Sequence, residues 1–173
     1  MPYATPQRFI QEYGLDETTQ FLADEQQLLT NQLLSDALVG SWTGTPSAAE
    51  QAAANAAKDR ITRKLLTNSN FMDGYLRSAV TLPLSPADAN AGTLEDCCVA
   101  LTRCGLADDA DNATERMDKV GDQWRTWLKD VQAGRANLVN TVGEEVPSRG
   151  RVRTGQAVSG FNWDGYPPMW SPR

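Results

Sequence analysis

Residues 71–86 read Phe-Met-Asp-Gly-Tyr-Leu-Arg-Ser-Ala-Val-Thr-Leu-Pro-Leu-Ser-Pro, and within them the helical pattern of the chain breaks off. Pro83 and Pro86 lack a backbone N–H, and each disfavours helical geometry in the residue before it. A helix that precedes them is expected to end near Ala79 and to lead into a rigid, apolar elbow. The sequence predicts an all-α fold in which two groups of helices close over this elbow. The structural residues expected here are Tyr75, Leu76, Leu82, Pro83, Leu84 and Pro86.

One long helix is predicted before the elbow, capped by Ser47 and running to about Ala79. Its first half is rich in alanine, which has high helix propensity and permits close helix packing. Its second half has an apolar stripe at steps of three and four residues, interrupted by Asn68, where a polar neighbour or a bend is expected. Gly74 is costly inside a helix, so close passage of another backbone is expected beside it.

Shorter helices are expected around the long one. They cover residues 6–13, 24–39, 94–106 and 113–133, with one more helical turn at 15–22, which gives a bundle of about five helices. Thr93 and Asn112 are the expected N-caps of the last two. Trp124, Trp127 and Leu128 belong to the stripe of the last helix and are expected to be mostly buried against Met72 and Leu76.

Composition limits the class of protein. The 173 residues suffice for one compact domain with an appendage. The mean hydropathy is −0.46, and no apolar run approaches the roughly 20 residues of a membrane span. The N-terminus lacks the features of a signal peptide, so an intracellular protein without a membrane contact is expected. The absence of histidine removes Ser–His and Cys–His nucleophile pairs and histidine metal sites.

Charge is unevenly distributed. Residues 1–134 carry 11 Lys and Arg against 19 Asp and Glu, a net charge of −8, whereas residues 135–173 carry 5 against 3, a net charge of +2. An acidic body argues against tight binding to nucleic-acid phosphates as the main activity. The chain therefore divides into a predicted helical domain at 1–134 and an extended C-terminal arm at 135–173.

The arm combines glycine and proline, which prevent regular structure, with large apolar residues that a flexible linker would lack. It is expected to become ordered when it lies against a partner. Its arginines alternate with small or apolar residues; they serve solubility or contact an acidic surface, including that of a neighbouring copy. The candidate partner-binding residues are Arg149, Arg151, Arg153, Phe161, Trp163, Tyr166, Met169 and Trp170.

No catalytic site or cofactor is predicted. Cys97, Cys98 and Cys104 have no fourth ligand at a suitable spacing, so buried thiols are favoured over a metal site. Adjacent acidic residues are typical of a solvated surface, and no phosphate-binding loop or nucleophile elbow occurs. An enzyme is therefore not expected.

Three motifs occur in a fixed order: Pro-Tyr-Ala-Thr-Pro at 2–6, Asp-Gly-Tyr-Leu at 73–76 with Leu-Pro-Leu-Ser-Pro at 82–86, and Trp-Leu-Lys-Asp at 127–130 with Ala-Gly-Arg at 133–135. This ordered set resembles the head–tail connector family of Mu-like phages and prophages, first described only as a domain of unknown function. The resemblance covers roughly residues 1–139. Residues 40–57 look like an insertion, and the chain beyond 140 matches no pattern of the family.

The resemblance implies a small helical adaptor in the neck of a tailed phage, between head and tail, assembled in the host cytoplasm. Such adaptors form a ring, normally of twelve copies, beneath the portal protein, extend the DNA channel and dock the next neck or tail protein. An acidic body suits a channel through which the genome slides without specific binding. The matched motifs imply packing residues and no catalytic residue.

Two other classes stay open on the sequence. One is a small helical regulatory module that binds a host or phage protein as a monomer or dimer. The other is an enzyme with a carboxylate or metal site, which the lack of histidine disfavours. A native mass, or an electron-microscopy image of the protein with its portal, separates these classes.

Overall fold

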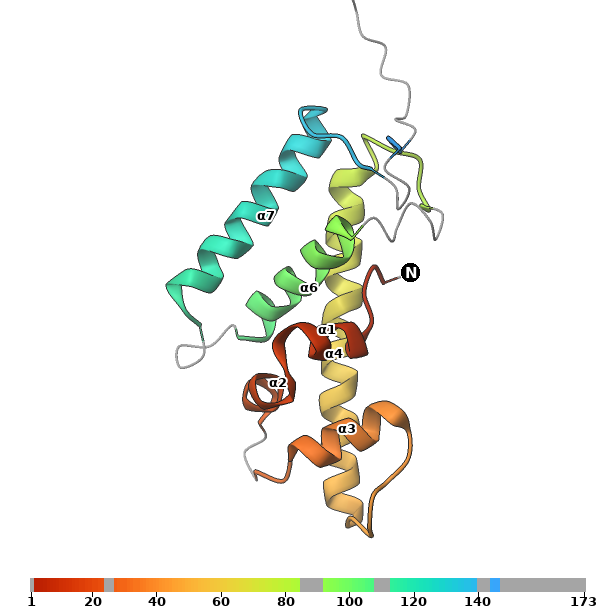
Figure 1. The fold of residues 1–173 in the computed structure, drawn as a ribbon, viewed down its shortest axis with the longest axis vertical. Coiled ribbons are helices and arrows are strands. Elements are labelled where there is room, and N and C mark those ends of the chain that lie inside the picture. The colour runs from red at the N-terminus through yellow and green to blue at the C-terminus, as the bar shows by residue number, and fades with distance from the viewer. Residues whose placement is uncertain (1, 24–26, 85–91, 108–112, 140–143, 147–173) are drawn as a thin grey trace, which may run out of the picture.

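The structure, a computed structural model, describes residues 2–23, 27–84, 92–107, 113–139 and 144–146. These residues form six α-helices and no β-strand, which confirms the predicted all-α fold. The long helix is α4, Ala48–Leu76, and it runs along most of the molecule (Figure 1). The others are α1 (Pro6–Tyr13), α2 (Leu15–Leu22), α3 (Asn31–Val39), α6 (Thr93–Leu106) and α7 (Glu115–Ala133).

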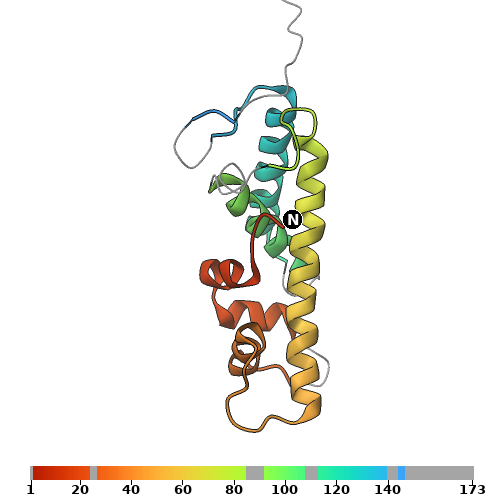
Figure 2. The same ribbon diagram turned by 90° about the vertical axis from the view of Figure 1, so that its right-hand side faces the viewer.

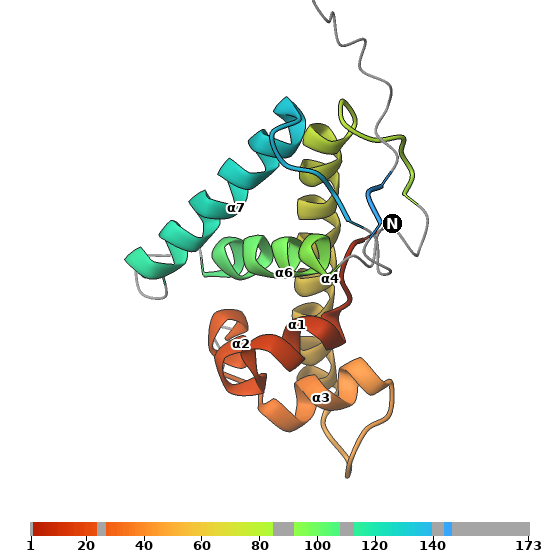
Figure 3. The same ribbon diagram turned by 45° about the horizontal axis from the view of Figure 1, so that its top comes forward.

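The five shorter helices lie on one side of α4 (Figure 2). α3 packs on the N-terminal half of α4, and α1 lies near its middle. α6 runs across the C-terminal half, and α7 contacts both α4 and α6 (Figure 3). The opposite side of α4 is covered by no other helix that the structure describes (Figure 2).

Hydroxyl side chains fix the start of four helices. Thr5, Thr30 and Thr114 each accept a hydrogen bond from a backbone N–H of the first turn, of α1, α3 and α7 respectively. Ser47 and Glu50 form a reciprocal capping box at the start of α4, as the sequence predicted for Ser47. Such caps satisfy backbone donors that have no partner inside the helix.

Two predicted N-caps were wrong. Thr93 is the first residue of α6, whose N-cap is Gly92 without a side-chain hydrogen bond. The cap of α7 is Thr114, whose hydroxyl accepts from the N–H of Met117, while Asn112 lies outside the described residues. Asn112 and Thr114 are both suitable caps for α7, and sequence alone could not show that Thr114 takes the extended N-cap geometry.

The core follows the inner face of α4. Ala54, Ile61, Leu65, Met72 and Leu76 are all at most 1% exposed. Asn68 interrupts this face and donates from Nδ2 to the hydroxyl of buried Thr102 on α6 at 2.9 Å, which confirms the polar neighbour expected there. The other fully buried large side chains are Phe9, Leu34, Leu94, Val99, Leu128 and Val131.

The elbow begins earlier than expected. α4 ends at Leu76 rather than near Ala79, because the carbonyl of Leu76 accepts from the N–H groups of both Ala79 and Val80 at 2.8 and 2.9 Å and closes a turn. Of the predicted structural residues, Leu76 is buried, Tyr75, Leu82 and Leu84 pack half-buried on the core, and Pro83 is exposed. Pro86 lies outside the described residues.

The N-terminal segment is tied to the C-terminal half of α4. The N–H of Tyr3 donates to the hydroxyl of Ser69 at 2.9 Å, and the Tyr3 hydroxyl donates to the carboxylate of Asp73. Ala4 beside it is buried. Two of the sequence motifs, at 2–6 and 73–76, are therefore in direct contact.

Ion pairs connect the first two helices to α6. The Arg103 guanidinium on α6 binds the Glu17 carboxylate of α2 through two nitrogens, and lies 4.5 Å from the centre of the Tyr13 ring. Arg8 of α1 bonds Asp96 of α6 at 3.0 Å. Because Arg103 and Glu17 are about 30% exposed in their side chains, their pair is partly shielded from water.

α7 ends at Gly134, which has φ 72° and caps the helix in the left-handed conformation, as the sequence predicted. Beyond it, Leu138 and Val146 are buried against the body, and the Val146 N–H donates to the Leu138 carbonyl at 2.9 Å. Most of residues 135–173 lie outside the described residues, so the division of the chain at 134 stays a prediction.

Candidate interaction surfaces

The predicted arm residues cannot be placed: Arg149, Arg151, Arg153, Phe161, Trp163, Tyr166, Met169 and Trp170 all lie outside the described residues. The candidate surfaces come instead from α7 and α4.

The predicted burial of the α7 tryptophans was partly wrong. Leu128 is fully buried, but Trp124 and Trp127 are only half-buried, stacked edge to face with their ring centres 5.7 Å apart. α6 has 14 residues and α7 has 19, so α6 does not cover the whole tryptophan side of α7. Part of each indole is left at the surface, where an amphipathic ring is well suited to contact a partner.

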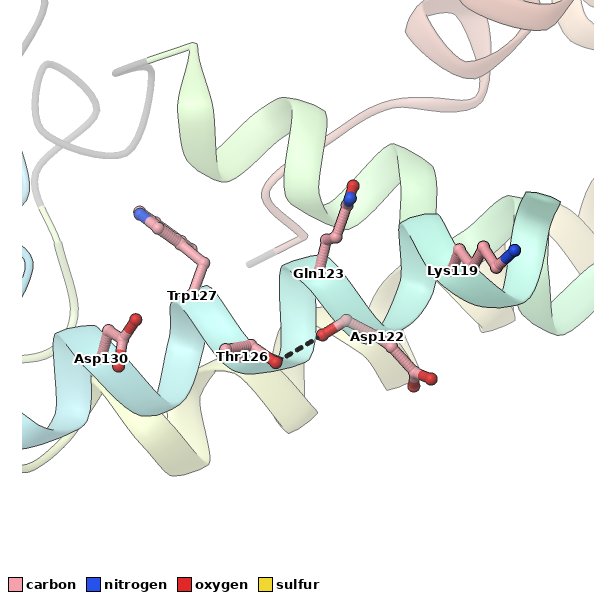
Figure 4. Close-up of a pocket in the computed structure, with 6 residues that line it drawn as sticks. All are labelled: Lys119, Asp122, Gln123, Thr126, Trp127 and Asp130. Atoms are coloured by element: carbon pink, nitrogen blue, oxygen red, sulfur yellow. Dashed lines mark hydrogen bonds between the residues drawn. The ribbon is translucent and has the colours of Figure 1, made fainter. Parts of the chain in front are cut away.

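Beside Trp127 lies a shallow, open depression, here called the α7 hollow (Figure 4). Most of its residues are exposed, whereas Trp127 and Asp130 are half-buried at its border with the core. The lining residues are Lys119, Asp122, Gln123, Thr126, Trp127 and Asp130.

Among the described residues, the charged groups of the α7 hollow pair only with neighbours on α7 or directly after it. Asp122 accepts from Arg125 at 2.9 Å, with side chains 75% and 47% exposed. Asp130 accepts from Arg135, and Lys119 pairs with Glu115. Exposed pairs of this kind contribute about 0–1 kcal/mol, so a partner can exchange them at little cost.

The second surface is the outer face of α4, formed by the exposed residues Arg60, Arg63, Leu66, Thr67, Asn70, Phe71 and Gly74. Leu66 is 45% and Phe71 40% exposed, and they are the two large apolar side chains of α4 that are left exposed to solvent among the described residues. Figure 2 shows that this face looks away from all the other helices.

Gly74 leaves a notch in this face. A Cβ added to Gly74 would meet no described atom of the chain within 4 Å, so no backbone in the described part of the chain makes the close passage that was expected there. Its φ is not positive, so the helix does not require glycine there. A glycine at such a position costs up to about 1 kcal/mol relative to alanine, and no contact with the residues that the structure describes compensates for it.

The outer face of α4 is also basic. Residues 48–77 carry five Lys and Arg against three acids, a net charge of +2, whereas the chain as a whole has −6. Arg60 and Arg63 have no ion-pair partner among the described residues. Basic and apolar groups thus share one uncovered helix face on an acidic protein.

The cysteines have no ionisable thiol suited to chemistry. Burial raises the pKa of Cys97 to about 12, and burial also raises the pKa of Cys98 and Cys104. Thiols with raised pKa values are poor nucleophiles and poor metal ligands at neutral pH. In the described part of the chain no three or more Cys, Asp or Glu side chains are grouped as metal ligands.

Sequence reasoning overlooked the outer face of α4. The signal was present: Leu66 and Phe71 fall outside the buried stripe and lie on the same side of the helix as Gly74. They could have been recognised as apolar residues that the fold leaves partly exposed, although the Phe71 ring packs edge to face on Tyr75 with ring centres 5.1 Å apart. No helix in the described part of the chain has the length and apolarity needed to cross a membrane.

Residues 3–155 match the family described as Bacteriophage Mu, Gp36. The chain belongs to the bacteriophage Mu Gp36 family. Membership makes it a Mu-like phage protein and suggests a structural or assembly role. The match reaches residue 155, so it corrects the sequence-based limit near 139 and includes part of the predicted arm. No curated protein and no solved structure matches the chain.

Proposed function

We propose that this member of the Mu Gp36 family is the head–tail connector of its phage, a structural protein of the virion neck. In this proposal it forms a ring, with twelve copies expected, under the portal protein. The ring extends the DNA channel and docks the next neck or tail protein. It carries out no catalysis and holds no cofactor.

The observation that carries the proposal is the pair of uncovered helix faces, on α4 and α7. A ring requires heterologous contacts, in which two different surfaces of each copy meet. The outer face of α4 is basic with exposed Phe71, and the α7 hollow offers carboxylates beside Trp127, so the two faces differ in chemistry. An isolated regulatory monomer would not need two such faces.

The charge of the chain supports passage of DNA without adhesion. The net charge of −6 repels the phosphate backbone at long range, and repulsion prevents a genome in transit from binding to the wall of a channel. The chain contacts DNA in this proposal without reading its sequence.

The arm beyond Gly134 is the proposed contact to the portal or to a neighbouring copy. Arg149, Arg151 and Arg153 would orient it against acidic surface, and its aromatic residues would anchor it. A chain cut after Val146 keeps the two buried residues that follow α7, Leu138 and Val146, and is expected to fold but not to join portal-bearing heads.

The proposal is tested by the assembly of phage particles from a prophage that lacks the gene of this protein. Full-length protein supplied in trans should restore infectious particles and appear as a ring under the portal by electron microscopy. Native mass spectrometry of the purified chain with portal protein should give a multimeric complex. Particles that mature without the protein, or its copurification with a non-virion protein instead, would contradict the proposal and favour a regulatory module.

A further inference from the structure

The outer face of α4 has three properties that the fold of a single chain does not explain. Leu66 and Phe71 are 45% and 40% exposed, Arg63 has no ion-pair partner among the described residues, and Gly74 leaves empty space. Each is unfavourable or neutral in an isolated chain. All three become favourable if another molecule packs on this face.

The notch at Gly74 indicates how closely the partner approaches. Residues three and four positions away on a helix are its surface neighbours, so the notch lies between Asn70, Phe71 and Arg77. Because glycine has no side chain there, a partner helix or a bulky side chain can approach the α4 backbone directly. An aromatic ring beside such a notch, here Phe71, is a common anchor of protein interfaces.

The chemistry of the outer face selects an acidic and aromatic partner surface. An arginine without an ion-pair partner can bind a carboxylate, and a guanidinium or an aromatic ring packs well on the face of a tryptophan. The α7 hollow supplies both, since it is lined by Asp122 and Asp130 next to the half-buried Trp127. In Figure 4 Trp127 rises from α7 at the edge of the hollow.

An α7 hollow that docks on this face cannot belong to the same chain, because the chain's own α7 packs on the side of α4 opposite to the outer face (Figure 2). We propose that the outer face of α4 in one copy docks on the α7 hollow of the next copy, with Phe71 against Trp127 and Arg63 toward Asp122 and Asp130. This inference rests on the proposed ring and names the two surfaces that close it.

The first test identifies the occupant directly. The full-length chain with a benzophenone amino acid at Phe71 is assembled on portal-bearing heads and irradiated, and the crosslinked peptides are identified by mass spectrometry. We expect a product of twice the chain mass whose crosslink maps to residues 115–133. The matched control places the same group at Val39, which is 75% exposed and lies at the end of α3. It should not crosslink to α7.

A crosslink from Phe71 to residues 135–173, to the portal protein or to DNA would overturn the inference. So would the absence of any crosslink to a second copy.

The second test exchanges charges across the interface. Arg63→Glu and Asp122→Arg should each weaken ring assembly about tenfold or more, and the double variant should recover most of it, because each interface then again pairs opposite charges. Both positions are exposed, so circular dichroism should be unchanged in every variant. Two harmless single variants, or a double variant as defective as the singles, would overturn the pairing.

The third test fills the notch. Gly74→Gln adds a side chain that the isolated chain accommodates, since nothing lies within 4 Å of the new Cβ. It should leave folding intact and lower ring assembly about tenfold or more. Ala49→Gln, at the exposed opposite end of α4, is the control and should assemble normally. Normal assembly of Gly74→Gln would show that no partner approaches the notch.

These outcomes separate the inference from the proposed function. If the unmodified chain never joins portal-bearing heads, the connector proposal fails. If it forms rings and Phe71 crosslinks elsewhere, the connector proposal stands and only the assignment of the two faces fails.

Discussion

In the N-terminal half of the molecule α4 meets α3 through alanines, whereas in the C-terminal half it meets α6 and α7 through long side chains. Ala54 and Ala57 are 0% and 3% exposed, and beside them the Lys58 ammonium donates to the carbonyl of Ala37 on α3 at 2.8 Å. Leu65 and Met72 fill the other half.

The two halves are therefore sensitive to opposite changes. Where large side chains interdigitate, removing atoms leaves a cavity; where alanines allow close contact, adding atoms forces the helices apart. α4 thus packs through small side chains in its N-terminal half and through large side chains in its C-terminal half.

The largest effect is expected from Leu65→Ala in the C-terminal half. Leu65 is 1% exposed, so its truncation leaves a cavity that costs about 2–5 kcal/mol of the free energy of unfolding. Urea denaturation followed by circular dichroism measures it. Leu66→Ala, next in sequence but exposed, is the control and should change the free energy much less. Equal losses for the two variants would show that the inner and outer faces are misassigned.

Ala54→Leu tests whether adding atoms to the N-terminal half of α4 destabilises the fold. The added atoms have no space between α3 and α4, and overpacking of this kind costs about 1–3 kcal/mol. Ala52→Leu introduces the same side chain on the exposed side of the same turn and should be nearly neutral. If Ala54→Leu were as stable as its control, the alanines would not be a close contact.

Asp36→Asn should loosen the loop between α3 and α4. The Asp36 carboxylate accepts from the Thr43 N–H at 2.7 Å, from the Thr43 hydroxyl and from Gln32, and the Thr43 backbone bond is the main reason that its pKa is lowered. A lowered pKa means that the stabilisation is complete above the ordinary carboxyl pKa of about 4 and is lost as the pH falls through the folded value.

The wild type should therefore be more stable than Asp36→Asn at pH 7, and the difference should shrink toward pH 3. Thermal unfolding at both pH values measures it. A difference of the same size at both would mean that the charge of Asp36 is not what holds the loop.

The smallest expected effect has the opposite sign. Gly74→Ala should stabilise the isolated chain by about 0.5–1 kcal/mol, because the helix accepts alanine there and the unfolded chain loses freedom. Ala56→Gly, on the same outer face, should destabilise by a similar amount. Destabilisation by Gly74→Ala would show that Gly74 has a role within its own chain.

The sequence was sufficient for elements whose signals are local. The hydroxyl of Ser47 caps α4 as predicted, and α1, α3 and α7 end at the predicted residues 13, 39 and 133, each directly before a glycine. Asn68 was recognised as a polar break in an apolar stripe, and its partner is Thr102. Capping and periodicity depend on neighbours within a turn, so they can be read without tertiary structure.

The sequence was insufficient wherever the answer depends on what lies opposite a side chain. Periodicity gave the face of α7 that carries Trp124 and Trp127, but not that α6 leaves part of it uncovered. Likewise the cost of Gly74 was evident, yet only the arrangement of the helices shows that no described residue of the chain lies against it. The two partly uncovered faces, on α4 and α7, are therefore the features of the described structure that the sequence did not locate.

The contact of Tyr3 with Ser69 and Asp73 constrains the order of events during synthesis. The bonding partners lie 66 and 70 residues apart in sequence, so the N-terminal segment has no place to dock until Asp73 has left the ribosome. At about 5–20 residues per second, that delay lasts several seconds. The motif at 2–6 is thus translated first but must remain undocked until most of α4 exists.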